Sequence, residues 1–376
     1  MMAPSATALG IRLRVLAEGP DVSATSAAEH EVGDYRDLEA LRAFARTVDV
    51  ITFDHEHVPT EHLRVLQSEG VVLHPGPDAL QYAQDKLLMR QACERLGLPN
   101  PQWAAVSSTR ELEEFGERIG WPVVLKTPRG GYDGKGVRVV RGPEQAAECT
   151  DWFELDFEAL LVEQMVPFTR ELSAQVARTP SGQAVPYPVV ESLQTDGVCD
   201  LVTAPAPRLD PTTATAAQQA AVTLAEGLGV TGMLAVELFE TPGTGPGFMV
   251  NELAMRPHNS GHWSMDGAVT GQFEQHVRAV LDLPLGSPDP VGAYTVMKNY
   301  LGGANQDLYA AFPAALSAHP EAKVHAYGKS VRPGRKIGHV TVVAPRAEDL
   351  GRARASAEGA AAIIRDGAPD AAPAAP

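Results

Sequence analysis

The first eighty residues alternate between short apolar runs and amphipathic segments. The apolar runs predict strands at 9–17, 49–53 and 71–73. Apolar residues at helical spacing predict helices at 35–47 and 60–68, the second with Thr60 as its N-cap. Strands alternating with helices are typical of a parallel sheet with crossover helices, so we expect residues 1–80 to form a half-Rossmann domain.

The middle of the chain, 81–285, carries longer elements. We expect helices at 78–96 (ended by Gly97 and Pro99), 111–119, 144–153 and 272–281. We expect strands at 122–125, 137–140, 160–166, 171–178, 233–240 and 248–254.

The last third is richer in short strands. We expect strands at 293–299, 322–327 and 338–343, followed by a helix at 347–365. These elements predict a small β-rich domain over 286–366. Residues 367–376 are rich in Ala and Pro, and we expect them to be disordered.

Composition narrows the class of protein. A chain of 376 residues with 44% hydrophobic and 21% charged residues is typical of a soluble globular protein with two or three domains. Its net charge of −16 argues against nonspecific binding to nucleic acid or anionic membranes. Three widely spaced cysteines, and no apolar run of about 18 residues, favour a reducing cytoplasmic location without a signal peptide or membrane span.

A glycine-rich hairpin occupies 120–140, with the sequence GWPVVLKTPRGGYDGKGVRVV. Four glycines between Gly130 and Gly136 would allow close approach of the backbone to a ligand, and Lys126 and Lys135 bring positive charge to an anion. The loop lacks the Ser or Thr of a Walker loop and does not open a helix as a dinucleotide fingerprint does. It is either a mobile surface hairpin or a phosphate lid.

Two glutamates lie inside apolar strands that a Gly/Pro loop joins. Glu237 belongs to MLAVELFE and Glu252 to FMVNELA. Two such carboxylates on neighbouring strands repel each other unless a cation lies between them. Side chains alternate between the two faces of a strand, so Glu237 and Glu240, three residues apart, would point to opposite faces. If one face is exposed to solvent, the pattern would expose Glu240 rather than Glu237. We therefore predict that Glu237 and Glu252, with Asn251, hold Mg²⁺ or Mn²⁺ against a phosphate.

Three further polar clusters have candidate roles. Asp54-His55-Glu56-His57 follows a predicted strand, fits no zinc spacing, and predicts Glu56 as a substrate-side hydrogen bonder. The segment Lys329–Lys336 carries four cations in a Pro/Gly turn, which indicates a phosphate site in so acidic a protein. The motif RPHNSGHW follows the second acidic strand directly.

Taken together, K-x-x-x-GGYDGKG, the paired acidic strands and RPHNSGHW resemble the N5-carboxyaminoimidazole ribonucleotide synthetases, an ATP-grasp family of purine biosynthesis. The resemblance implies a mixed α/β and α+β chain: an ATP-grasp domain preceded by a truncated half-Rossmann domain and followed by the small β-rich domain. It implies ATP-dependent carboxylation of 5-aminoimidazole ribonucleotide with bicarbonate, through carboxyphosphate. The expected partners are small molecules, and the expected assembly is a homodimer.

The resemblance assigns roles residue by residue. Residues expected to contact ATP are Lys86, Lys126, Gly131, Tyr132, Asp133, Gly134, Lys135, Gly136, Val137, Glu163, Gln164, Met165, Val166, Glu171, Gln194, Asn251 and Glu252. Backbone groups near 163–166 would pair with the purine, and Glu171 would accept the ribose hydroxyls. Expected catalytic residues are Lys126, Arg256, which would reach the γ-phosphate, and the candidate bases His258 and His262. Expected ribonucleotide contacts are Asn259, Ser260, Lys329, Arg332, Arg335 and Lys336.

The chain departs from the family pattern in three places. Gln194 stands where a histidine is usual and Met255 where a proline is usual. The chain opens on MMAPSATALG, which reads as the end of a helix, whereas the family carries a strand and a GGGQL-like turn before it. We therefore expect part of the first sheet and of a substrate site to be missing.

Three alternatives stay open on the sequence. Another ATP-grasp ligase, such as a formate-using ribonucleotide transformylase or a biotin carboxylase, would share the ATP motifs. A nucleotide sensor would keep Lys126 and Glu171 without needing paired metal carboxylates. A family member inactivated by loss of its first strand is the third.

Overall fold

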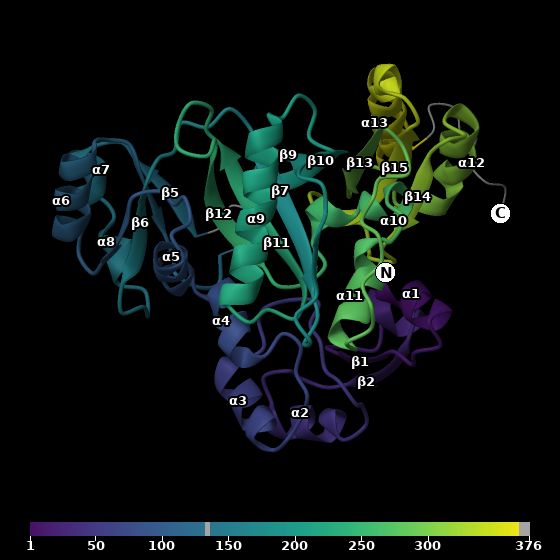
Figure 1. The fold of residues 1–376 in the computed structure, drawn as a ribbon, viewed down its shortest axis with the longest axis horizontal. Helices are drawn as coiled ribbons and strands as arrows, with labels where there is room; N and C mark the ends of the chain where they lie inside the picture. The colour runs from purple at the N-terminus through teal and green to yellow at the C-terminus, as the bar shows by residue number, and fades with distance from the viewer. Residues whose placement is uncertain (132–135, 368–376) are drawn as a thin grey trace.

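The structure is a computed structural model that describes residues 1–131 and 136–367. Figure 1 shows the N-terminal part below a large central sheet, a smaller sheet to the left and the C-terminal helices at the upper right. No helix within the described ranges is long and apolar enough to cross a membrane.

The N-terminal part is less regular than the apolar pattern predicts. Its elements are α1 (Met2–Ala8), β1 (Arg14–Ala17), η1 (Ser23–Ser26), β2 (Glu29–Val32), α2 (Leu38–Ala45) and α3 (Thr60–Ser68). β1 and β2 pair in parallel, whereas the strands expected at 49–53 and 71–73 are reduced to one parallel bridge between Ile51 and Leu73. Thr60 is not the N-cap of α3: it is the first helical residue, after Pro59, and its hydroxyl bonds to the Gln84 side chain.

The long helix expected at 78–96 is two helices, α4 (Pro77–Gln84) and α5 (Lys86–Arg95). Asp85 between them is extended, and its carboxylate accepts hydrogen bonds from the N–H groups of Leu87 and Leu88 at 2.9 and 3.2 Å. Aspartate favours such a cap over a helix interior. The break also turns the N–H of Lys86 to the carbonyl of Pro128, 2.9 Å away, which ties α5 to the start of the hairpin loop.

A four-stranded antiparallel sheet carries the hairpin, in the order β3 (Trp103–Val106), β6 (Leu160–Gln164), β4 (Val123–Lys126), β5 (Val137–Val140). Three helices accompany it: α6 (Thr109–Ile119), α7 (Pro143–Ala147) and α8 (Thr150–Phe153). The last two replace the single helix expected at 144–153. Their apolar side chains enclose a separate small core around Leu112, Leu125 and Val162.

The large sheet has nine strands, in the order β12-β11-β7-β9-β10-β13-β15-β14, with β8 beside β7. Their bounds are β7 (Glu171–Arg178), β8 (Ala184–Pro186), β9 (Val190–Thr195), β10 (Val198–Ala204), β11 (Gly232–Glu240), β12 (Phe248–Ala254), β13 (Tyr294–Leu301), β14 (Lys323–Ala326) and β15 (Lys336–Ala344). The strands expected at the C-terminus thus extend the same sheet that carries Glu237 and Glu252.

Helices and short turns cover this sheet. They are α9 (Pro211–Gly227), η2 (Asn259–Gly261), α10 (Ser264–Gly267), α11 (Gln272–Val280), α12 (Leu308–Ala318), η3 (Ala347–Asp349) and α13 (Leu350–Asp366). α9 and the N-terminal helices share one core with Leu234, Val236 and Leu238 of β11. Since side chains alternate along a strand, Glu237 points to the opposite face, where α11 packs.

Candidate active site

The two predicted acidic residues lie directly opposite each other. β11 and β12 are antiparallel, with Glu237 in register with Glu252. The Glu237 side chain is 27% exposed and that of Glu252 is 42% exposed. Burial raises the pKa of Glu237 above its ordinary value, and the charges of Glu252 and Glu171 raise it further. A cation at this position would relieve that repulsion.

Glu171, Gln194, Glu237 and Asn251 line one small pocket, together with Leu172, Ser192 and Leu238. Burial raises the pKa of Glu171, a hydrogen bond from Gln194 opposes the rise, and the charge of Glu252 adds to it. The structure therefore brings four of the predicted nucleotide and metal contacts together, although they come from β7, β9, β11 and β12.

Lys126 lies at the end of β4 and is buried. Its Nζ is 2.7 Å from Glu163 Oε2 and 3.5 Å from Asn251 Oδ1. The other oxygen of Glu163 pairs with the guanidinium of Arg90, which is fully buried. Lys86 at the start of α5 is 3.8 Å from Glu252. Positive charge thus gathers around Glu252 and Asn251 from two directions.

The sequence did not identify Arg90 as a residue that supports this site. Its position was predicted to be helical, and an arginine in a helix is most often a solvated surface charge. The available signal was its spacing: Lys86 and Arg90 are four residues apart, so they share one face of α5, the face that packs on β12.

The segment 163–166, predicted to pair with the purine through its backbone, spans the end of β6 and the residues after it. Glu163 and Gln164 belong to β6, which is paired on both sides, and the N–H of Gln164 donates to the carbonyl of Gln102 at 2.8 Å. That N–H is therefore used within the protein. Met165 and Val166 follow the strand, and the Met165 side chain is exposed.

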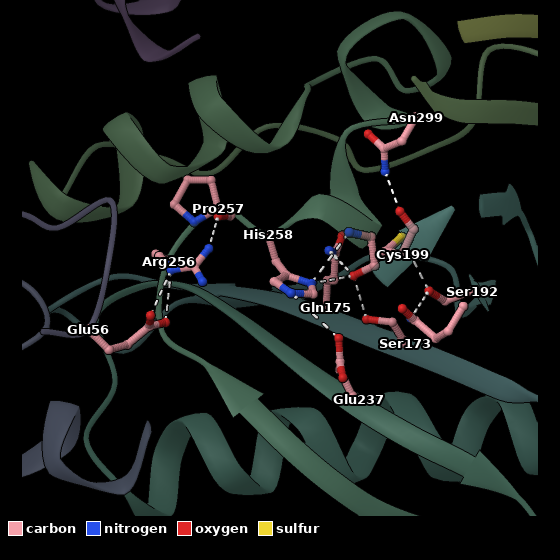
Figure 2. A network of polar contacts seen from close by, with 12 residues as sticks. Glu56, Ser173, Gln175, Ser192, Cys199, Glu237, Arg256, Pro257, His258 and Asn299 are labelled. Carbon is pink, nitrogen blue, oxygen red and sulfur yellow. Dashed lines mark hydrogen bonds and ion pairs between the residues drawn. The ribbon is translucent and has the colours of Figure 1, made fainter. Parts of the chain in front are cut away.

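The RPHNSGHW segment lies above the Glu237 face of the sheet. Figure 2 shows His258 directed toward Glu237 and Arg256 directed toward Glu56. His258 Nε2 is 3.5 Å from Glu237 Oε1, and Arg256 Nε is 2.9 Å from the Glu56 carboxylate. Glu56, predicted as a substrate-side hydrogen bonder, is therefore within the site but engaged by Arg256.

Gln272 at the start of α11 fixes this segment. Its Oε1 accepts from the N–H of His258 at 2.9 Å, and its Nε2 contacts the His258 carbonyl and His262 Nδ1 at 2.9 and 2.7 Å. Burial, with a smaller contribution from nearby positive charges, lowers the pKa of His258 well below its ordinary value and that of His262 to about 3. Both rings are therefore neutral at pH 7.

Ser260 and Asn259 differ in what surrounds them. The Ser260 hydroxyl is fully buried and bonds to Ser173, Gln175 and His258 at 2.8, 3.2 and 2.8 Å. It therefore supports the loop, and its contact with substrate stays a prediction. Both polar atoms of the Asn259 side chain are buried without a hydrogen-bond partner in the described structure.

Comparisons with known proteins connect this geometry to a family. Residues 1–84 match the ribonucleotide synthetase preATP-grasp domain, 91–273 the ATP-grasp domain and 295–353 the phosphoribosylaminoimidazole carboxylase C-terminal domain. N5-carboxyaminoimidazole ribonucleotide synthase of Mycobacterium tuberculosis is 50% identical over 347 residues, covering 89% of this chain and 79% of that protein. The chain belongs to the N5-carboxyaminoimidazole ribonucleotide synthase family.

Solved structures of this family share the fold. The Thermus thermophilus synthetase has a TM-score of 0.87 at 36% identity and covers 98% of this chain and 96% of its own. The Aspergillus clavatus synthase in complex with ADP and 5-aminoimidazole ribonucleotide has a TM-score of 0.85 at 29% identity, covering 97% and 95%. The resemblance and the fold class expected from the sequence are thus confirmed.

The basic turn, residues 329–336, ends at Lys336, which is the first residue of β15. Arg335 donates to the hydroxyl and carbonyl of Ser330 at 2.7 and 3.3 Å. Burial lowers the pKa of Lys329, and the charges of Arg335 and Lys336 lower it further, so these cations are close together. Lys336 is also among the charges that act on Glu237, after burial and the neighbouring carboxylates. Lys336, the last residue of the turn, is therefore close enough to Glu237 for its charge to act on that carboxylate.

The hairpin loop is described only at its ends. Tyr132, Asp133, Gly134 and Lys135 lie outside the described residues. Gly136 has a φ of +70°, and a Cβ there would lie 2.4 Å from Thr127 Oγ1, so a larger residue would not fit. The carbonyl of Gly136 accepts a hydrogen bond from the N–H of Thr127 at 3.0 Å. Gly131 and Val137 lie next to Gly136 at the base of the hairpin loop.

The Glu163 ion pairs predict a specific acid sensitivity. Burial alone would raise the pKa of Glu163, but Lys126 and Arg90 lower it to about 2, from an ordinary value of 4.5. A lowered folded-state pKa contributes stability that is complete above pH 4.5 and is lost as the pH falls toward 2. The free energy of unfolding of Glu163→Gln should therefore differ from wild type most above pH 4.5 and progressively less below it.

Urea unfolding at a series of pH values measures this difference. Glu117→Gln, on the exposed face of α6, removes the same charge and serves as the control. A Glu163→Gln deficit that stays constant from pH 5.5 to pH 2.5 would contradict the assigned ion pairs.

Proposed function

We propose that the chain carries out the ATP-dependent carboxylation of 5-aminoimidazole ribonucleotide with bicarbonate in purine biosynthesis. The products would be N5-carboxyaminoimidazole ribonucleotide, ADP and phosphate. Membership of the synthase family supports this reaction. Within the chain, the observation that carries it is the cross-strand pair Glu237–Glu252 beside the pocket of Glu171 and Gln194.

The reaction divides into two transfers. An oxygen of bicarbonate attacks the γ-phosphorus of ATP, ADP leaves, and carboxyphosphate forms. The exocyclic amine of the ribonucleotide then attacks the carboxyl carbon, or CO2 released from it, and phosphate leaves as the amine loses a proton. Phosphoryl transfer of this kind depends mainly on positioning and charge neutralisation.

Glu237, Glu252 and Asn251 fit a magnesium ion, and Mn²⁺ has the same ligand preference. The fit rests on oxygen donors and on the raised pKa of Glu237, which burial causes mainly and the neighbouring carboxylates add to. No group of three or more His, Cys, Asp or Glu in the described residues is arranged to hold a metal alone. The remaining ligands would be phosphate and water oxygens, and the ion would neutralise charge on the triphosphate.

The lysines supply fixed positive charge. Lys126 is held by Glu163 and lies beside Asn251, which suits it to a phosphate of the bound nucleotide. Lys86 beside Glu252 would contact a second phosphate oxygen. Arg256 is paired with Glu56, so its predicted contact with the γ-phosphate requires the remaining guanidinium nitrogens. The closed hairpin would exclude water from carboxyphosphate.

The candidate proton acceptors are neutral. Because burial lowers the pKa of His258 and of His262, each ring is neutral at pH 7 and has one unprotonated nitrogen. In His262 this nitrogen is Nδ1, which accepts from the side-chain amide of Gln272. His258 lies nearer the acidic pair and His262 is held by Gln272. We favour His258 as the acceptor of the amine proton and His262 as support for the loop.

The remaining contacts divide between two ligands. The segment 163–166, Glu171 and Gln194 would hold adenosine, with Gly131, Gly136 and Val137 at the phosphates. The ribonucleotide would meet Asn259 and the cations Lys329, Arg332, Arg335 and Lys336. The two unpartnered polar atoms of Asn259 support a ligand at that position.

The compartment and assembly are also proposals. Cys93, Cys149 and Cys199 are free and buried, which supports a reducing cytoplasm. The homodimer stays a prediction, which sedimentation velocity would test.

The reaction is tested by ADP release. With bicarbonate and Mg²⁺ present, adding 5-aminoimidazole ribonucleotide should stimulate ADP release at least tenfold, and N5-carboxyaminoimidazole ribonucleotide should accumulate in equal amount. Stimulation by formate with another ribonucleotide, or by biotin, would favour the other ATP-grasp ligases. ATP binding without ADP release under every condition would favour a sensor or an inactive family member.

The basic turn predicts a selective change in affinity. Arg335→Ala removes a cation from the proposed ribonucleotide phosphate site, so the KM for the ribonucleotide should rise at least tenfold and the KM for ATP less than twofold. Arg354→Ala, on the exposed face of α13, is the matched control and should change neither constant. Equal increases in both KM values for Arg335→Ala would place the turn outside the ribonucleotide site.

A further inference from the structure

β12 contains a bulge at Asn251. Its pairing with β11 runs from Glu252 opposite Glu237 directly to Val250 opposite Leu238, so Asn251 has no partner in β11. An extra residue of this kind bends the strand and redirects side chains, and it is common beside active sites.

The core contacts of β12 show what the bulge changes. Phe248 and Val250 pack into the core beneath the sheet, and so do Leu253 and Met255. The buried positions therefore switch from even to odd numbers across Asn251. In a regular strand Glu252 would share the face of Val250 and point into that core. The bulge instead turns Glu252 toward Glu237.

Arg90 binds the backbone at this bulge. Its Nη1 donates to the carbonyl of Val250 at 2.7 Å and its Nη2 to the carbonyl of Asn251 at 3.0 Å. Successive carbonyls of a regular strand point in opposite directions, so a shared donor for two of them requires the bulged conformation. β12 is an edge strand of the large sheet, and these carbonyls would otherwise be buried against α5 without a partner.

The guanidinium is itself held in place. Nη1 also donates to Asn100 Oδ1 at 2.9 Å, and Nε pairs with the carboxylate of Glu163. The side chain is fully buried. Only a planar fork of donors can satisfy both carbonyls, an amide and a carboxylate at once, which a lysine ammonium cannot do.

We propose that Arg90 is the positioning residue of the cation and phosphate site. It stabilises the bulge that turns Asn251 and Glu252 together toward Glu237. Through the shared carboxylate of Glu163 it also fixes Lys126, whose Nζ lies 3.5 Å from Asn251 Oδ1. Arg90 thereby sets the positions of Lys126, Asn251 and Glu252 from outside the site, and this role rests on the proposed use of Mg·ATP.

The test compares Arg90→Lys with Arg95→Met, an exposed arginine of the same helix. Asn100→Ala, which removes one acceptor that orients Arg90, is the milder second variant. Calorimetry measures the affinity for the ATP analogue AMPPNP, with Mg²⁺ and with EDTA, and for 5-aminoimidazole ribonucleotide. Hydrogen–deuterium exchange reports the order of residues 248–255.

Arg90→Lys should weaken Mg·AMPPNP binding at least tenfold and metal-free AMPPNP binding less than threefold. Hydrogen–deuterium exchange of residues 248–255 should be faster than in wild type. The affinity for 5-aminoimidazole ribonucleotide should stay within twofold of the wild-type value. Asn100→Ala should weaken Mg·AMPPNP binding about threefold, again more than it weakens metal-free binding. Arg95→Met should match wild type in every measurement.

Wild-type Mg·AMPPNP affinity in Arg90→Lys and Asn100→Ala would overturn the proposal. So would equal losses with Mg²⁺ and EDTA, or losses of both ligands together, which indicate a purely structural role. If Arg90→Lys does not fold, Asn100→Ala decides between these outcomes. Failure of the wild type to carboxylate the ribonucleotide would refute the proposed reaction, while the nucleotide and exchange measurements would still test Arg90.

Discussion

The site depends on carboxylates that are held close together where burial disfavours their charge. Glu237 and Glu252 are in register on neighbouring strands, with Glu171 on the next strand. Burial is the main cause of the raised pKa of Glu237, and the charges of Glu252 and Glu171 raise it further. An apolar pair would stabilise the sheet better, so the arrangement is costly to the fold unless a cation is bound. Nearby lysines partly offset the negative charge of these carboxylates. Lys86 lies 3.8 Å from Glu252, and the charge of Lys336 lowers the pKa of Glu237.

A second carboxylate connects this pair to the hairpin. Glu163 is almost completely buried and divides its two oxygens between Arg90 and Lys126. The lysine belongs to the small sheet, whereas Arg90 grips β12 of the large one. A shift of the hairpin sheet relative to β12 would therefore disturb both Lys126 and the acidic strand.

The parts of this site that depend on residues close together in the sequence could be predicted from the sequence. Glu237 and Glu252 could be placed opposite each other because two apolar runs flank a short Gly/Pro loop, the pattern of a hairpin. The kink at Asp85 could have been predicted too, since an aspartate followed by an apolar run is a common N-cap. The helix α9 was missed although Asp210-Pro211 is a strong start signal, because its Ala/Thr-rich sequence has little amphipathic contrast.

Other features depend on contacts between distant parts of the chain. Arg90 meets Glu163 across 73 residues and Val250 across 160, and Arg256 meets Glu56 across 200. No local periodicity encodes such pairs. The same limit applies to the strands at 49–53 and 71–73, whose apolar residues bury against helices without forming a continuous ladder.

The central claim is that Glu237 and Glu252 bind one divalent ion together with ATP. Mn²⁺ titrated into the protein with AMPPNP, and followed by electron paramagnetic resonance, measures this directly. Glu237→Gln and Glu252→Gln should each weaken Mn²⁺ binding at least tenfold. The double variant should be little worse than either single one, because ligands of a shared ion are not additive. Wild-type Mn²⁺ affinity in either single variant would contradict the claim, as would fully additive losses.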